Sequence, residues 1–167
     1  MKYIEPEVGV ASIRRAKQEL EFIQLGIKNH HVDHFRHFID QYYCFKNGYV
    51  NKNGGAAWGK IIFKEWVSNN AIGLIKKKVV HKEHVVPLKV LKVILMKLKN
   101  PSLEEIEKTL DSNLFYATIT KEEDKLLRNA GLNSKMPEEY YDVNSVVFQD
   151  PFARYKKVGI ELHKLNQ

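Results

Sequence analysis

Hydrophobic positions in the first third of the chain recur at helical spacing. From Ser12 onwards, apolar residues fall three or four positions apart, which is the repeat of one helix face. The first stripe consists of Ile13, Ala16, Leu20, Ile23 and Ile27, and the second of His31, Phe35, Phe38, Ile39 and Tyr42. Lys46-Asn47-Gly48 then suits a helix C-terminus. The pattern predicts one long helix, or two in series, ending near Gly48.

The middle of the chain mixes helical and extended patterns. Residues 56–67 favour a further helix, with both tryptophans and Ile62 partly on one side. Residues 79–86 are rich in β-branched side chains and are followed by Pro87, which predicts a strand that ends at the proline. Residues 88–99 are apolar nearly all round and indicate a buried helix, with a strand as the alternative.

Two capping boxes organise the second half. Ser102-Leu103-Glu104-Glu105 and Thr120-Lys121-Glu122-Glu123 each place a hydroxyl three residues before a glutamate, a pattern that begins helices. Leu114 to Ile119 form a β-rich run between them. Asp150-Pro151 begins a last short helix over residues 152–158, with Gly159 at its C-terminal turn.

These elements predict an α+β, mostly helical protein. Its centre is a strand–strand–helix core with a helical insertion, flanked by N-terminal helices and a short C-terminal helix. At 167 residues, 44% of them hydrophobic, the chain can bury a core and is expected to form one domain. Within it we expect a helical part over residues 1–72, the core over 73–131 and a C-terminal segment over 132–167.

Charge and composition narrow the class of partner. A net charge of +7 favours a polyanion such as nucleic acid, although many basic proteins have no such partner. Cys44 is the single cysteine, which excludes an internal disulfide framework and a cysteine-rich zinc site. The sequence has no apolar signal core and no run long enough to span a bilayer, so we expect a cytoplasmic protein.

The predicted strand carries an unusual pair of titratable residues. Glu83-His84-Val85-Val86-Pro87 resembles the signature that opens the motif of HNH endonucleases, the ββα-metal family. Asn113-Leu114 resembles the central Asn-Leu of that motif, and residues 119–125 resemble its closing strand-to-helix segment. The resemblance covers roughly residues 79–128 and implies a ββα-metal-like core.

The resemblance implies a metal-dependent endonuclease, acting on DNA more than on RNA. In that interpretation His84 is the general base, Asn113 ties down the loop that presents it, and Glu83 and Asp124 bind Mg²⁺ or Mn²⁺, with Zn²⁺ less favoured. Alternate residues of a strand face opposite sides, so Glu83 and His84 can reach one metal only if the chain bends there. From its position alone, Asp124 could equally serve the positive end of a helix.

Lysines near the motif are the candidate nucleic-acid contacts. Lys82 and Lys125 could contact the scissile phosphate, and the run Lys76-Lys77-Lys78 could contact the backbone. Specificity in so short a chain would be modest or would need a homodimer. The alternative function is a non-catalytic nucleic-acid- or protein-binding module, whose surface is the lysine run with a histidine-rich helix.

Histidines form a second candidate cluster. His30, His34 and His37, with Gln41, are spaced to share one face of a predicted helix, where they could hold zinc or another transition metal. The alternatives are a solvated face or a contact with a nucleic-acid backbone. His81 lies on the Glu83 side of the predicted strand, where it could support the metal ligands or face solvent.

Overall fold

The structure is a computed structural model that describes residues 9–74 and 79–165. This described part has six α-helices and a four-stranded sheet, so the predicted α+β, mostly helical class is confirmed. Lys76, Lys77 and Lys78, expected to contact nucleic acid, lie outside the described residues. Among the residues described, no helix combines the length and the apolar character needed to cross a membrane.

The chain divides into two compact units. The first unit comprises Met1–Ile61 with Leu95–Leu110, and the second comprises Ile62–Ile94 with Asp111–Gln167. Helices α3 (Leu88–Met96) and α4 (Leu103–Asn113) each run across a boundary between the units. The helix expected after Pro87 is confirmed as α3, which is buried only in part: Leu91 and Leu95 are fully buried, whereas Val93 is 52% exposed.

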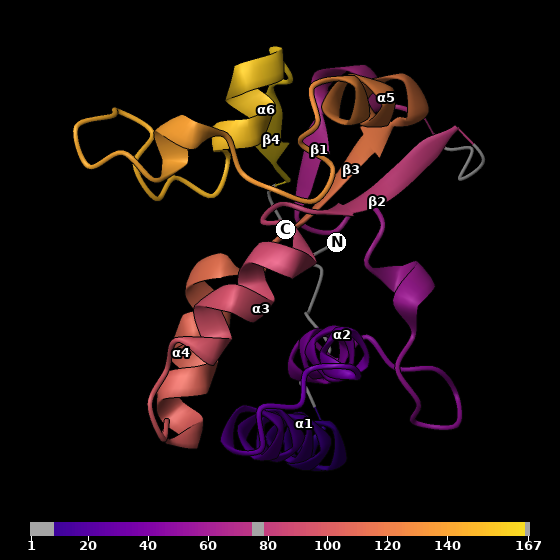
Figure 1. Cartoon of the computed structure of the whole chain (residues 1–167). Helices are drawn as coiled ribbons and strands as arrows, with labels where there is room; N and C mark the ends of the chain where they lie inside the picture. The colour runs from indigo at the N-terminus through magenta and orange to yellow at the C-terminus, as the bar shows by residue number, and fades with distance from the viewer. Residues whose placement is uncertain (1–8, 75–78, 166–167) are drawn as a thin grey trace. The chain divides into compact units, whose positions relative to one another are not determined.

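A helical hairpin dominates the first unit. Helices α1 (Val10–Lys28) and α2 (Phe35–Lys46) lie side by side (Figure 1), so the predicted helical stretch is two helices in series. Gly26 allows their close approach, since a Cβ there would lie 2.3 Å from Cε1 of Phe35. The N-terminal part of α4 joins the same unit, where Glu107 accepts a 3.2 Å hydrogen bond from the Tyr42 hydroxyl.

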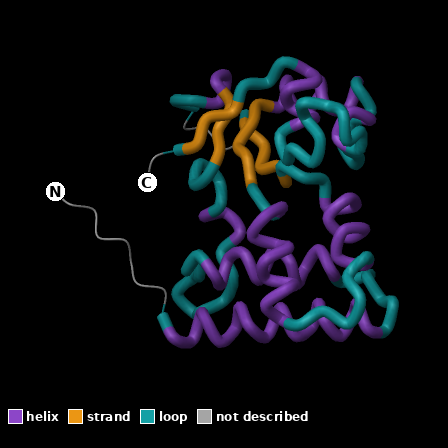
Figure 2. Tube along the Cα trace, turned by 90° about the vertical axis from the view of Figure 1, so that its left-hand side faces the viewer, coloured by secondary structure: helices purple, strands orange, loops and turns teal. Residues whose placement is uncertain are grey.

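The second unit is built on a mixed sheet, whose strands Figure 2 shows in orange. Strands β1 (Trp66–Ser68), β2 (Val80–His84), β3 (Tyr116–Thr120) and β4 (Leu162–Lys164) lie in the order β2-β3-β1-β4. Strand β2 is antiparallel to β3, β1 is parallel to β3, and β4 is antiparallel to β1. The two central strands are therefore β3 and β1.

One predicted helix is wrong. Residues 56–67 contain only the short 3₁₀ turn η1 (Trp58–Lys60) and then enter strand β1. Pairing on both sides of β1, with β3 and β4, outweighs the weak helical pattern. The loop after β1 forms a second 3₁₀ turn, η2 (Asn69–Ala71), and a third, η3 (Glu138–Tyr140), lies before the C-terminal helix.

Helices α5 (Lys121–Asn129) and α6 (Ala153–Val158) lie against one face of the sheet. Their apolar side chains join those of β3 in a cluster made up of Val85, Ala117, Ile119, Leu127, Leu132, Tyr155 and Ile160. A smaller cluster on the opposite face contains Val67, Ala71 and Val80. Along the chain, β2, β3 and α5 come in the predicted strand–strand–helix order, and α3 and α4 are inserted between β2 and β3.

The local stop and start signals also hold. Both capping boxes form: the Glu105 carboxylate accepts from the Ser102 amide at 2.7 Å, and the Glu123 carboxylate accepts from the Thr120 amide at 2.8 Å. Gly159 ends α6 with a φ of 74°.

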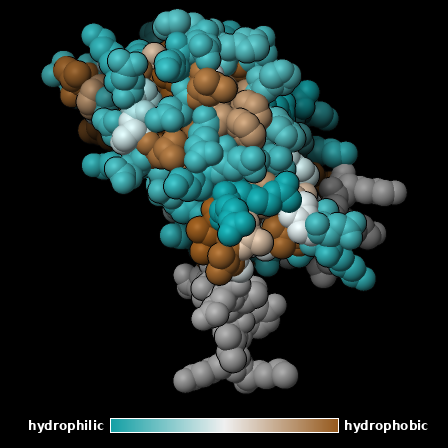
Figure 3. Space-filling view, turned by 90° about the horizontal axis from the view of Figure 1, so that it is seen from below, coloured by the Kyte–Doolittle hydropathy of each residue, from teal (hydrophilic) through white to brown (hydrophobic). Residues whose placement is uncertain are grey.

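On the face of the molecule shown in Figure 3, apolar side chains form small separate patches among hydrophilic ones.

Candidate metal site

The alternation of side chains along β2 decides which residues can meet. His81 is paired with Ile119 and Glu83 with Ala117, and both partners belong to the cluster under α5 and α6. Paired residues of adjacent strands share a face of the sheet. His81 and Glu83 therefore face the two helices, and the intervening residues of β2 face the other way.

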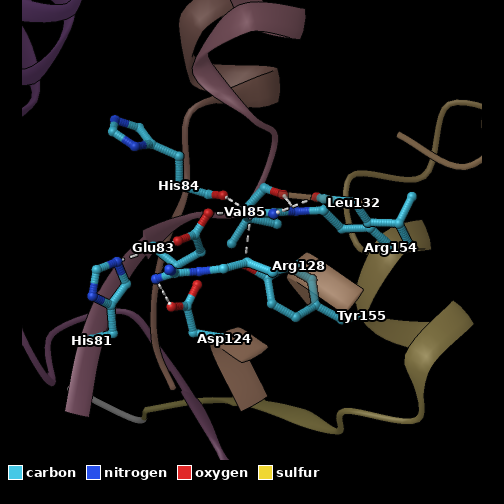
Figure 4. Close-up of polar contacts among 9 residues, drawn as sticks. All are labelled: His81, Glu83, His84, Val85, Asp124, Arg128, Leu132, Arg154 and Tyr155. Atoms are coloured by element: carbon cyan, nitrogen blue, oxygen red, sulfur yellow. Dashed lines mark hydrogen bonds and ion pairs between the residues drawn. The ribbon is translucent and has the colours of Figure 1, made fainter. Parts of the chain in front are cut away.

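Asp124 approaches this face from the first turn of α5. Its helix begins directly after β3 because Thr120 and Glu123 form the capping box, and this places Asp124 over the edge of the sheet with 8% of its surface exposed. One ligand atom from each of His81, Glu83 and Asp124 lies within 4.8 Å of the others (Figure 4). We call these three residues the His81–Glu83–Asp124 group.

Arg128 lies one helical turn after Asp124 and forms an ion pair with it. The hydrogen bond that Arg128 donates to Asp124 is the main cause that raises the pKa of Arg128, and the charges of Asp124 and Glu83 raise it further. The Arg128 side chain is 61% exposed. The positively charged guanidinium of Arg128 therefore lies beside the carboxylates of the group and is open to solvent.

Arg154 holds the group from the buried side. Its side chain is fully buried, and it donates hydrogen bonds to Glu83 Oε1 at 2.8 Å and to the carbonyls of Val85 and Leu132 at 2.9 and 3.0 Å. It also donates to the His84 carbonyl. A buried guanidinium requires a counter-charge, which Glu83 supplies. The same burial raises the pKa of the neighbouring Tyr155 well above 10.0.

Sequence reasoning did not find the role of Arg154. Nothing in the short basic stretch Arg154-Tyr155-Lys156-Lys157 distinguishes a buried arginine from an exposed one. The only signal in the sequence was its position directly between the apolar Ala153 and the aromatic Tyr155.

His84 does not lie with Glu83 and Asp124, which corrects the expectation drawn from the family motif. Its ring lies 4.7 Å from that of Tyr116, its partner across the ladder, and Figure 4 shows it pointing away from Glu83. The bend that the motif would need is missing, since regular pairing runs through His84 and the Val85 amide still donates to Phe115 at 2.8 Å.

The other predicted residues of the motif are scattered. Lys82 lies on the His84 face of the sheet, where its amino group is 5.4 Å from the centre of the Tyr116 ring. Lys125 is exposed on α5. Asn113 is the last residue of α4, at the entry to β3, and its role in supporting the site stays a prediction.

The second metal cluster expected from the histidines does not form. His30 lies beyond the end of α1 with a φ of 55°, and His34 is the N-cap of α2, so only His37 is inside a helix. The chain turns between the two helices, and this turn removes the shared face that an unbroken helix would have given. Within the described residues, the His81–Glu83–Asp124 group is the one cluster of three or more residues suited to a metal.

The donor set of the group fits a divalent cation. Two carboxylates supply hard oxygen ligands of the kind that Mg²⁺ and Mn²⁺ prefer, and an imidazole nitrogen is compatible with Mn²⁺ or Zn²⁺. His81 Nε2 is 3.6 Å from Glu83 Oε2, so Glu83 has one oxygen toward His81 and the other toward Arg154.

Comparisons of the chain with protein-family models, with curated proteins and with solved structures give no match. The resemblance to HNH endonucleases therefore stays a prediction that rests on the motif residues.

Proposed function

We propose that this chain is a metal-dependent endonuclease that hydrolyses phosphodiester bonds in nucleic acid, with DNA favoured over RNA. The observation that carries the proposal is the convergence of Glu83 and Asp124, which are far apart in the sequence, beside the imidazole of His81. Phosphodiester hydrolysis needs ligands for a cation and a base for water, and these residue types supply both. The net charge of +7 supports a polyanionic substrate.

Glu83 and Asp124 would hold the cation, for which Mg²⁺ or Mn²⁺ is best suited. When bound, it supplies Lewis-acid stabilisation of the charge that develops on the scissile phosphate. Arg154 fixes Glu83 through Oε1, which leaves Oε2 on the side of His81. The exposed guanidinium of Arg128 is suited to contact a phosphate oxygen.

His81 takes the role of general base in this proposal. Its side chain is 46% exposed, so water reaches the ring, and the Glu83 carboxylate lies close enough to orient it. A neutral imidazole accepts a proton near neutral pH. The proposal thus gives His81 the role that the family resemblance assigns to His84, whose ring faces the opposite side of the sheet.

A plasmid-nicking assay tests the proposal. Cleavage is expected with Mg²⁺ or Mn²⁺ and is expected to stop in EDTA. His81→Ala, Glu83→Gln and Asp124→Asn should each reduce the rate by at least about a hundredfold. His84→Ala is the matched control, since it removes the neighbouring imidazole on the other face of the sheet and should retain activity. Full activity in His81→Ala, or its loss in His84→Ala alone, would contradict the assignment of the base.

Metal binding is measured separately from turnover. Titration with Mn²⁺ should raise the melting temperature of the wild type and of His81→Ala, because binding to the folded state stabilises it. Glu83→Gln and Asp124→Asn should lose this shift. A loss in His81→Ala as well would make His81 a ligand in place of a base.

The second candidate is a non-catalytic module that binds nucleic acid. The observation in its favour is that both carboxylates already have arginine partners, Asp124 with Arg128 and Glu83 with Arg154. In this case binding is unchanged in EDTA and no cleavage occurs. Arg128→Ala separates the two candidates: it should tighten Mn²⁺ binding if Asp124 is a metal ligand, and should only weaken DNA binding if Arg128 is a phosphate contact alone.

A further inference from the structure

The second unit contains a pocket of about 600 Å³ away from the His81–Glu83–Asp124 group. Its volume is within the range of small-molecule sites. Residues of β1, of β4 and of the segment that leads through α6 line it, among them Trp66, Phe152, Tyr155, Lys156, Glu161 and Leu162.

Aromatic rings form one wall of the pocket. The ring centres of Trp66 and Phe152 are 4.5 Å apart with their planes tilted by 56°, and Phe115 stacks on Phe152 at 6.1 Å. The indole nitrogen of Trp66 is buried and has no hydrogen-bond partner among the described residues. Because this nitrogen is not accessible to solvent, a ligand in the pocket would contact Trp66 through its ring. A wall of this kind suits stacking against a flat, π-bonded ligand.

The polar side chains at the pocket are suited to a phosphate and to a base edge. Lys156 supplies a cationic group, which is paired with Asp150 at 2.5 Å. Glu161 accepts a 2.6 Å hydrogen bond from the Asn69 side chain, which holds its carboxylate in place. The lysine is a donor for phosphate oxygens, and the carboxylate is an acceptor for the exocyclic amines of bases.

The register of the sheet relates the pocket to the candidate metal site. Glu83 of β2 and Trp66 of β1 are both paired with Ala117, on opposite sides of β3. All three residues thus lie in one row across the sheet and on one face, with Glu83 and Trp66 about 10 Å apart at two strand spacings. Helix α6 contributes to both places, since Arg154 binds Glu83 and Tyr155 lines the pocket.

We propose that the pocket is a subsite for an unpaired base of single-stranded nucleic acid, which stacks on the ring of Trp66 with Phe152 against its edge, beside the phosphate held at the metal site. The proposal rests on the proposed function in taking nucleic acid as the substrate. It adds that the strand crosses this row of the sheet and that one flanking nucleotide is held by stacking.

Tryptophan fluorescence gives a direct test. The chain has two tryptophans, so Trp58→Phe leaves Trp66 as the sole reporter. A short oligothymidylate, titrated in EDTA so that no cleavage occurs, should quench this fluorescence. An oligonucleotide of the same length made of abasic residues should give no quenching and bind on the order of tenfold more weakly, because it cannot stack.

A pocket-filling variant provides a second measurement, in a chain that keeps both tryptophans. Leu162→Phe places a ring in the pocket and should weaken oligothymidylate binding about tenfold while leaving abasic binding unchanged. Leu25→Phe, on the exposed surface of α1, is the matched control and should change neither. Circular dichroism verifies that each variant is folded.

The outcomes separate this proposal from the nuclease proposal. Equal binding of the thymidylate and abasic strands, without quenching of Trp66, would overturn the subsite even if metal-dependent nicking is observed. Quenching with the thymidylate alone supports the subsite even if no metal-dependent nicking is found, in which case only the nuclease proposal fails.

Discussion

Arg154 is the residue that most directly connects the core of the second unit to the candidate site. It is fully buried and donates to Glu83 and to the carbonyls of Val85 and Leu132. A buried ion pair of this kind adds little net stability over an apolar pair, but removing one partner leaves an uncompensated charge. Arg154 thus makes a carboxylate at position 83 a requirement of the fold as well as of the site.

Replacing Arg154 should destabilise the protein strongly. Arg154→Met is expected to lower the free energy of unfolding by about 3–5 kcal/mol, because Glu83 loses its buried cation and the carbonyls of Val85 and Leu132 lose their buried donor. Urea denaturation followed by circular dichroism measures this. The control is Arg128→Met, which removes the exposed partner of Asp124 and should change stability less. The double variant Arg154→Met/Glu83→Leu should recover part of the loss, and a purely additive effect would contradict the pairing.

Glu19 of α1 is a second buried charge, in the first unit. It is 4% exposed, its Oε1 accepts a long hydrogen bond of 3.4 Å from Gln41, and its Oε2 has no partner among the described residues. Burial raises the pKa of Glu19 from 4.5 to about 7, and the charge of Arg15 only partly opposes this. Between about pH 4.5 and 7 the folded protein therefore keeps a proton on Glu19 that the unfolded chain releases.

This shift predicts a stability that falls as the pH rises. Between about pH 4.5 and 7 the folded state binds the Glu19 proton and the unfolded state does not, so stability falls across this range and is lowest above it. The loss should be on the order of 2 kcal/mol. Thermal unfolding from pH 5 to pH 8 measures it, with Glu19→Gln as the comparison. The variant should lack this dependence and be more stable than the wild type at pH 8; parallel curves for both proteins would contradict the prediction.

At the scale of elements, the two capping boxes differ in how many contacts they make outside their own helix. The Ser102–Glu105 box is exposed and satisfies only its own helix end. Glu123 is 4% exposed, and its carboxylate also accepts from the Ser68 hydroxyl at 2.5 Å and the Asn70 side chain at 3.0 Å. The same local motif thus starts α5 and ties it to the end of β1 and the η2 turn.

Equivalent substitutions in the two boxes should therefore differ in their effect. Glu105→Ala is expected to cost about 0.5–1 kcal/mol, the usual value of an exposed cap. Glu123→Ala should cost about 2–4 kcal/mol, since it also leaves buried donors without an acceptor. Chemical denaturation of both variants measures the difference. Equal losses would mean that the contacts of Glu123 with Ser68 and Asn70 contribute nothing.

At the scale of the whole molecule, the excess of positive charge governs encounter with a polyanion. Lysines and arginines number 27 against 20 acidic residues. Release of counterions from DNA makes binding by such a protein strongly dependent on salt. This dependence is shared by the catalytic and non-catalytic candidates, because it arises from charge and not from the metal site.

Binding to duplex DNA should weaken by more than tenfold between about 50 and 200 mM salt. Fluorescence anisotropy in EDTA measures this without cleavage. Asp124→Asn is a useful comparison, since it removes one negative charge beside the DNA-binding candidate Arg128 and should bind at least as tightly as the wild type. An affinity for DNA that does not change with salt would contradict the proposal that the positive charge of this protein binds nucleic acid.

Local signals in the sequence predicted the elements that they could define. The stripes of α1 and α2 and both capping boxes have patterns long enough to identify helices. Strands β1 and β4 have three residues each, too few for any repeat to be recognised. Their pairing partners are distant in the chain, so only the assembled sheet could place them. At the candidate site, the sequence predicted Glu83 and Asp124 but not the place of His81 beside them, because the pairing of β2 with the distant β3 decides which residues of β2 face α5.

The sequence alone determined the mostly helical α+β class, the position of β2 and the start of α5, because these depend on contacts between residues near one another in the chain. It also placed Glu83 and Asp124 on elements that could meet. Only the tertiary structure decided which histidine accompanies them, since the pleat and register of β2 against β3 turn His81 toward α5 and His84 away from it. It likewise decided the burial of Arg154, which depends on packing between segments some seventy residues apart.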